Sequence, residues 1–181
     1  ALGEHELERV FRCVPNLKHK AILLTAFSCG LRVSEVVRLK LADIDSERMQ
    51  VLIERSKGKK DRYVTLSPVL LDVLRQYIRM SRPRPTIYLF EGQQAGGPYS
   101  VRSAQAIFNR AVVAAGIRKK VSFHSLRHSY ATHLLEKGVD IKYIKELLGH
   151  FNIKTTERYL HVAREKLIPI QSPLDFLSRD I

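Results

Sequence analysis

The chain has 181 residues, 45% of them apolar and 27% charged, a balance typical of one globular domain. No apolar run approaches the roughly 20 residues of a membrane-spanning helix, so the composition excludes a membrane protein, a disordered chain and a disulfide scaffold. The 31 lysines and arginines against 18 acidic residues give a net charge of +13, which favours a nucleic-acid partner over a merely solvated basic surface.

The first part of the chain predicts helices followed by a strand pair. Apolar spacing predicts helices over residues 4–13 and 17–29, and after Gly30 a short helix from Arg32 to Leu39. Residues 49–55 and 62–66 alternate as two strands, joined by a glycine-containing hairpin connection.

The second part of the chain is mostly helical. Ser67-Pro68 supplies an N-cap and a first-turn proline for a helix to about Met80, and the proline- and glycine-rich residues 82–99 form a loop. Further helices are expected over residues 100–115, 125–137, 140–148 and 154–162. Ser172-Pro173 predicts a short terminal helix. The predicted fold is α+β, mainly α, with a small antiparallel sheet.

The charge excess belongs to the folded body. Residues 1–16 and residues 172–181 each sum to −1, so residues 17–171 carry +15. Neither Cys13 nor Cys29 lies in a CxxC pair, so both are expected to be ordinary core thiols. Their number fits a reducing compartment, and a cytoplasmic location is expected.

Several cationic and ring side chains occupy positions that packing alone does not explain. Arg32 follows Gly30 at a helix start, and Glu35 lies one turn on, within reach to orient it. Arg127 leaves its helix at the edge of an apolar face, where an unpaired charge is costly and a bound phosphate would complete it. His150 directly follows Gly149 at a helix end.

Each of these residues has an ordinary structural alternative when taken alone. Either arginine could form a salt bridge, His150 could be a capping or core histidine, and Tyr159 could be a packed aromatic. Lys57 is one of three lysines in an exposed turn.

Together, five blocks resemble the tyrosine recombinase (phage integrase) family, in its Xer-like branch, over roughly residues 5–165. The blocks are Gly30–Glu35, Lys57–Arg62, His124–His128, Leu147–His150 and Thr155–Tyr159. Their order and spacing match the family. The resemblance implies the helical catalytic domain of these enzymes, with the small sheet carrying a lysine hairpin.

The resemblance also assigns roles. The six catalytic positions fall on Arg32, Lys57, His124, Arg127, His150 and Tyr159. Glu35 and His128 are expected to support them, and Lys59, Lys60 and Arg62 are expected to contact DNA.

The implied reaction is attack by Tyr159 on a DNA phosphodiester, giving a 3′-phosphotyrosine link and, after strand exchange, a Holliday junction. A free tyrosine has a pKa near 10, so Tyr159 must lose its proton as it attacks, with His124 as the acceptor. Arg32, Arg127 and His150 would stabilise the charge on the phosphate oxygens, and Lys57 would protonate the leaving 5′-oxygen, with Lys59 as its substitute. The phosphotyrosine bond conserves energy, so no ATP is expected.

No cofactor or metal is expected either. The acidic residues Asp43, Asp45 and Glu47 fit turn and strand-entry positions better than a magnesium site. His124 and His128 have an i, i+4 spacing, but the glutamate of an HExxH zinc motif is missing.

The expected domains are a catalytic domain over residues 1–167 and a tail helix over residues 168–181. The tail either docks on a neighbouring protomer or folds back on its own domain. The family's N-terminal core-binding domain is expected to be absent from this chain.

The expected partner is a double-stranded recombination site, bound by a homo-tetramer of the full-length enzyme. Two alternatives remain: DNA relaxation like that of a type IB topoisomerase, and a non-catalytic DNA-binding module. The catalytic interpretation requires the six side chains to converge around one scissile phosphate, and coordinates that place the guanidinium groups of Arg32 and Arg127 far apart would contradict it.

Overall fold

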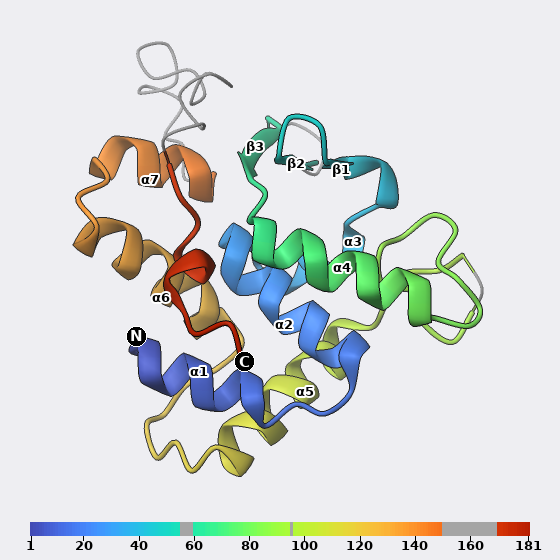
Figure 1. Cartoon of the computed structure of the whole chain (residues 1–181), viewed down its shortest axis with the longest axis horizontal. Coiled ribbons are helices and arrows are strands. Elements are labelled where there is room, and N and C mark those ends of the chain that lie inside the picture. The colour runs from blue at the N-terminus through green and yellow to red at the C-terminus, as the bar shows by residue number, and fades with distance from the viewer. Residues whose placement is uncertain (55–59, 95, 150–169) are drawn as a thin grey trace.

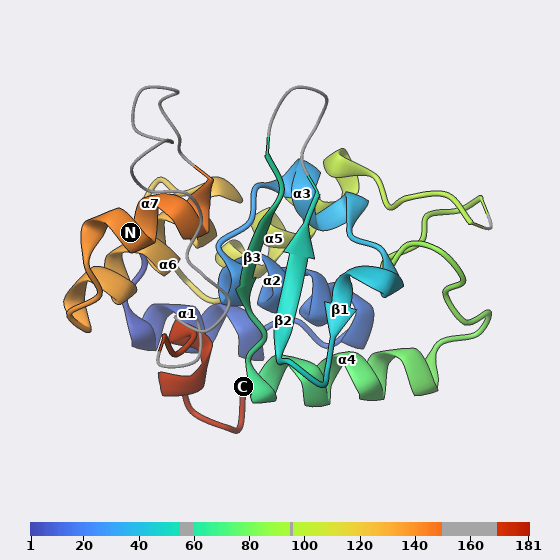
Figure 2. The same cartoon turned by 90° about the horizontal axis from the view of Figure 1, so that it is seen from above.

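The computed structural model describes residues 1–54, 60–94, 96–149 and 170–181. Helices form most of the molecule, and a three-stranded sheet lies along one side of them (Figures 1 and 2). The α-helices are α1 (Glu4–Arg12), α2 (Leu17–Cys29), α3 (Val33–Arg38), α4 (Pro68–Met80), α5 (Val101–Ala114), α6 (His124–Glu136) and α7 (Ile141–Leu148). Each begins and ends within one residue of its prediction. The helix predicted over residues 154–162 lies outside the described residues.

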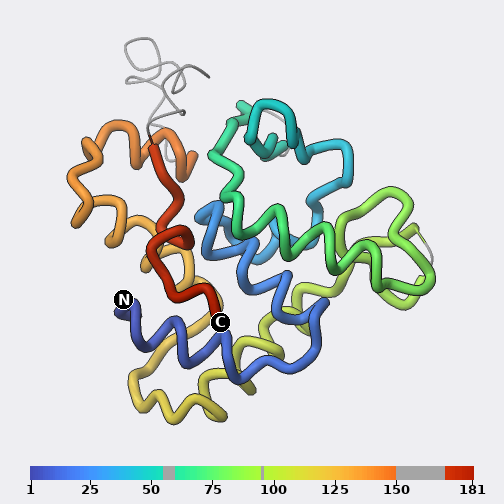
Figure 3. Tube along the Cα trace, viewed as in Figure 1, coloured from blue at the N-terminus to red at the C-terminus, as the bar shows by residue number. Residues whose placement is uncertain are grey.

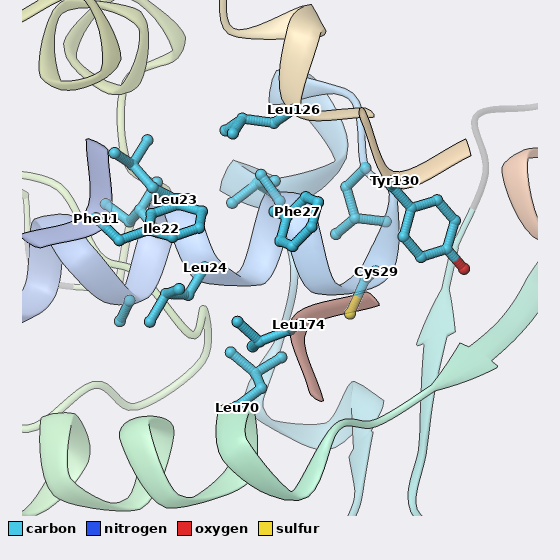
Figure 4. Packing of buried hydrophobic residues seen from close by; sticks show 14 of the residues in the cluster. Phe11, Ile22, Leu23, Leu24, Phe27, Cys29, Leu70, Leu126, Tyr130 and Leu174 are labelled. Carbon is cyan, nitrogen blue, oxygen red and sulfur yellow. The ribbon is translucent and has the colours of Figure 1, made fainter. Parts of the chain in front are cut away.

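Helix α2 is the centre of the fold, and its residues 21–30 are buried on every side. It contacts α1, α3, α4, α5 and α6. Figure 3 shows its trace running through the middle of the molecule. Figure 4 shows side chains from α1, α4 and α6 converging on it, among them Phe11, Leu70 and Leu126. A helix that is apolar all round is stable only where neighbours cover every face, and α2 meets that condition.

The sheet is antiparallel, in the order β1 (Ile44–Asp45), β2 (Gln50–Ile53) and β3 (Arg62–Thr65). Val51 pairs with Val64 and Ile53 pairs with Arg62, which places alternate residues of β2 and β3 on the buried face. The two long strands were predicted. Strand β1 was not, because two residues are too few for a periodic signal.

The acidic residues before β2 take the positions predicted for them. Asp43 ends the 3₁₀ helix η1 (Leu41–Asp43), and Asp45 lies in β1, where its Oδ1 accepts a hydrogen bond of 2.9 Å from Arg48 N. They are turn and strand-entry residues.

Residues 170–181 pack against their own chain. Ser172 caps η2 (Pro173–Phe176), and its hydroxyl donates to the Ser28 carbonyl of α2 over 2.9 Å. Leu174 and Leu177 are buried in the core. The cap-plus-proline signal correctly located this short terminal helix, which is a 3₁₀ helix.

Both cysteines are free thiols, and Cys29 lies in the core as predicted, whereas Cys13 is only partly buried. Burial raises the pKa of Cys29 to about 12. Within the described ranges, no helix is long and apolar enough to cross a membrane.

Gly30 ends α2 at a position where a side chain would be unfavourable for two reasons. Its φ is 66°, in the left-handed region that favours glycine. A Cβ at this position would lie 2.4 Å from the ring of Tyr130 on α6. Gly30 therefore lets α2 and α6 approach closely at the point where α3 begins.

The substitution Gly30→Ala should destabilise the fold more than Gly116→Ala, which is a matched control. Gly116 has a φ of 72°, but a Cβ there meets nothing within 4 Å. We expect Gly116→Ala to lower the free energy of unfolding by about 1–2 kcal/mol through backbone strain alone. Gly30→Ala should lose about 1–3 kcal/mol more through the overlap with Tyr130. Urea unfolding measures both, and equal losses would contradict the close-contact explanation.

Candidate active site

Arg32 stands at the N-cap of α3, directly after the turn that Gly30 makes possible. Its backbone N–H donates to Oε1 of Glu35 over 3.0 Å, which fixes the first turn of α3. The Arg32 side chain is 35% exposed, so its guanidinium reaches solvent beside a buried carboxylate.

Arg127 joins the C-terminal ends of two helices. Its Nη1 donates to the carbonyl of Gly30, after α2, over 2.8 Å, and its Nη2 donates to the carbonyl of Leu148, in α7, over 2.6 Å. Carbonyls at a helix C-terminus lack partners within the helix, and the helix dipole favours a cation there. The Arg127 side chain is only 2% exposed. The sequence assigned the compensation of this charge to a bound phosphate, whereas the structure provides carbonyl partners inside the protein.

Arg62 is buried as deeply as Arg127, with 2% of its side chain exposed. Its Nη1 and Nη2 donate to the two oxygens of Glu35 over 2.7 and 3.0 Å, and its Nε donates to the carbonyl of Leu147 over 2.6 Å. This placement differs from the DNA contact predicted for Arg62, because its guanidinium faces the interior. Lys60, also predicted to contact DNA, is exposed.

The alternation of inward and outward residues along the strand is the sequence signal that indicates the inward direction of Arg62. Arg62 is two residues before Val64, so both lie on one face of β3, and Leu66 follows the strand in the same alternation. Both apolar residues are buried. A basic residue in register with them must also point inward, and the basic run that precedes it obscured this pattern.

The carboxylate of Glu35 lies among three guanidinium groups. Besides the two bonds from Arg62, Nη1 of Arg127 lies 3.7 Å from Oε1 and Nη1 of Arg32 lies 4.0 Å from Oε2. Arg32 and Arg127 are far apart in sequence, yet both guanidinium groups lie beside one carboxylate. The requirement that they lie together is met.

These contacts determine the ionisation of Glu35. Burial raises its pKa, but the hydrogen bonds and charge of Arg62, the N–H of Arg32 and the charge of Arg127 bring the pKa down to about 2. Glu35 is therefore an anion near neutral pH.

His124 is the first residue of α6, one turn before Arg127, and it is exposed. Partial burial and the neighbouring charges of Arg127 and Arg32 lower its pKa, with a further contribution from His128. A lowered pKa keeps the imidazole neutral near pH 7, the form that accepts a proton. His128 is exposed one turn further along α6.

The remaining predicted site residues lie outside the described part of the chain. They are Lys57, Lys59, His150 and Tyr159. Among the described residues, no group of three or more His, Cys, Asp or Glu side chains could hold a metal ion.

The sequence profile of the phage integrase family matches residues 1–166. The chain therefore belongs to this family, that of the tyrosine recombinases. The Sinorhizobium fredii protein y4qK, named as an integrase/recombinase, is 47% identical over 98% of this chain and 57% of its own length. The tyrosine recombinase XerA of Thermococcus kodakarensis is 37% identical over 99% of this chain and 64% of its own length.

Solved structures agree with the sequence relatives. A crystal structure of XerA recombinase superposes with a TM-score of 0.75 at 29% identity, covering 92% of this chain and 61% of that one. The XerH recombinase bound to its difH substrate gives a TM-score of 0.74 at 26% identity, covering 91% of this chain and 50% of that one. The chain thus spans about half to two thirds of the length of these proteins, and the predicted fold class is confirmed.

The depressed pKa of Glu35 predicts an acid-dependent loss of stability. The ionised carboxylate stabilises the fold above its ordinary pKa of 4.5, and this contribution falls away as the pH drops from about 4.5 to 2. Its full size is about 3 kcal/mol at 1.36 kcal/mol per pKa unit. Between pH 6 and pH 2 the wild type should lose about 3 kcal/mol more than Glu35→Gln, measured by urea unfolding at each pH. The exposed carboxylate Glu47 is the control, and Glu47→Gln should follow the wild-type curve. If Glu35→Gln also follows that curve, the ion pair does not stabilise the fold.

Proposed function

We propose that this chain is the catalytic part of a site-specific DNA recombinase that cuts and rejoins strands through a 3′-phosphotyrosine intermediate. The observation that carries the proposal is the meeting of the Arg32 and Arg127 guanidinium groups at Glu35, one helical turn from His124. Membership of the tyrosine recombinase family supports it. So does the DNA substrate held by the XerH neighbour, a property of that protein.

In this mechanism, Arg32 and Arg127 stabilise the negative charge on the scissile phosphate. When a nucleophile attacks phosphorus, negative charge accumulates on the non-bridging oxygens, and preorganised cations stabilise it. Arg32 reaches solvent, while Arg127 is held rigidly by two helix ends. Losing one preorganised donor typically slows such a reaction by ~10²–10³.

Proton transfers complete the cycle. The phenol oxygen of Tyr159 forms a bond to phosphorus and gives its proton to neutral His124, while the bond from phosphorus to the 5′-oxygen breaks. Lys57 protonates that oxygen, and His150 donates to the phosphate. The family match over residues 1–166 supports these roles of Tyr159, Lys57 and His150. Attack of a different 5′-hydroxyl on the phosphotyrosine reverses the steps, so the strands are exchanged without ATP.

The proposed assembly is a homo-tetramer of the full-length enzyme on two duplex sites, passing through a Holliday junction. The basic body of the chain supports a DNA partner, because cations near phosphates gain affinity by releasing counterions. Exposed Lys60 is one such cation.

The test is a covalent trap. The chain is incubated with nicked duplexes that carry a randomised segment. Because of the nick, cleavage releases a short fragment that diffuses away, so religation is prevented and the protein stays attached to the DNA. We expect an adduct whose linked peptide contains Tyr159. Tyr159→Phe should abolish it and change the dissociation constant for the trapped duplex less than about threefold. Tyr88→Phe is the matched control and should keep the adduct. An adduct that survives in Tyr159→Phe would reject the nucleophile.

The lowered pKa of His124 predicts the pH profile of the same reaction. Cleavage needs the neutral imidazole, so the rate of adduct formation should be constant at pH values well above the midpoint of the His124 titration. Below its midpoint it should fall about tenfold per pH unit. The midpoint should lie below 6.5, the ordinary histidine pKa. In His124→Gln the rate should be low and lack this acid limb, since glutamine does not titrate. A limb that persists in the variant would assign the base to another group.

A further inference from the structure

Arg62 has contacts that neither DNA binding nor simple packing accounts for. It is the first residue of β3 and directly follows the connection that carries Lys57 in the sequence. Its buried guanidinium takes both oxygens of Glu35 and the carbonyl of Leu147, so it joins β3 to α3 and to the end of α7. A planar guanidinium can satisfy all three acceptors at once, and a lysine could not.

Distances show how the charge of Glu35 is shared among the three arginines. Coulomb attraction falls with distance, and hydrogen bonding adds to it only at close range. Arg62 approaches the carboxylate to 2.7 and 3.0 Å, whereas Nη1 of Arg127 lies at 3.7 Å and Nη1 of Arg32 at 4.0 Å. Arg62 therefore compensates the largest part of the carboxylate's charge.

We propose that Arg62 is a positioning residue that neutralises Glu35, so that the charges of Arg32 and Arg127 act on the scissile phosphate. Glu35 thereby orients α3 and Arg32 without cancelling the cations that the reaction needs. Arg62 touches no reacting atom. The proposal rests on the proposed function and adds to it the electrostatic role of a residue outside the six catalytic positions.

The net charge of the cluster formed by Arg32, Arg62, Arg127 and Glu35 is the quantity that should control the rate. Three arginines and one carboxylate give +2 in the wild type. Arg62→Met lowers this to +1, and Glu35 then turns toward Arg32 and Arg127. The double variant Arg62→Met with Glu35→Gln returns the cluster to +2, although it cannot restore the hydrogen bond to Leu147. Recovery in the double variant therefore separates a charge effect from a structural one.

The experiment measures adduct formation on two versions of the duplex obtained from the covalent trap. One carries the ordinary phosphodiester at the cleavage point, and the other carries a neutral methylphosphonate, whose reaction develops less negative charge. Arg62→Met should slow adduct formation on the phosphodiester by about 10²-fold, as for a lost preorganised donor. On the methylphosphonate it should slow the reaction less than tenfold.

Two further variants test whether the effect of Arg62→Met is due to charge. The double variant should cleave the phosphodiester at least tenfold faster than Arg62→Met. Arg48→Met is the matched control, since Arg48 is exposed in the turn at the other end of β2, and it should cleave both substrates like the wild type. Circular dichroism establishes that each variant is folded. If Arg62→Met does not fold, Arg62→Gln replaces it, because glutamine keeps hydrogen-bond donors but removes the charge, and its loss must again be confined to the phosphodiester.

Failure of the inference and failure of the proposed function give different results. A wild type that forms no adduct rejects the function. A wild type that cleaves, beside an Arg62 variant that loses the same factor on both substrates, overturns the inference. So does a double variant no faster than Arg62→Met, because that result assigns the loss to the missing Leu147 bond.

Discussion

The ion pair between Arg62 and Glu35 is the interaction on which the site depends. Two buried guanidinium groups and a third, partly exposed one lie close together, which is costly unless an anion accompanies them, and Glu35 is that anion. Its carboxylate comes from α3, while the cations come from β3, α6 and the start of α3 itself. One buried charge thus determines how segments distant in the sequence meet, and the cations can be concentrated only where it holds them.

Helix ends supply the second constraint. α2 and α7 both end at a glycine in the left-handed conformation, Gly30 and Gly149. The carbonyls at these ends point out of the helices, and Arg127 and Arg62 are the donors that satisfy three of them. Two helix C-termini therefore hold the guanidinium groups of Arg62 and Arg127 in fixed positions. A side chain held at both ends loses little further entropy when it meets a phosphate, which is the physical meaning of preorganisation.

The sequence predicted the fold well where local rules are decisive. Ser67-Pro68, Gly30 and Gly149 mark helix ends by their own conformational preferences, so the boundaries followed from single residues. The inward direction of Arg62 was not predicted, because it depends on the register of β3 against β2 and on a carboxylate 27 residues away. Tertiary pairing of this kind leaves a trace only in strand alternation, and a run of basic residues conceals it.

Burial also changes what the basic composition means for the partner. The net charge of +13 counts every arginine equally, yet Arg62 and Arg127 each expose only 2% of their side chains. Under the proposed function, Arg62 contacts no phosphate and therefore releases no counterions from DNA, whereas exposed lysines do. If the chain binds and cleaves DNA as proposed, the salt dependence of binding reports on the exposed cations, and the rate of cleavage reports on the cluster around Glu35. In the Lys57–Arg62 block these two roles lie two residues apart, at exposed Lys60 and buried Arg62.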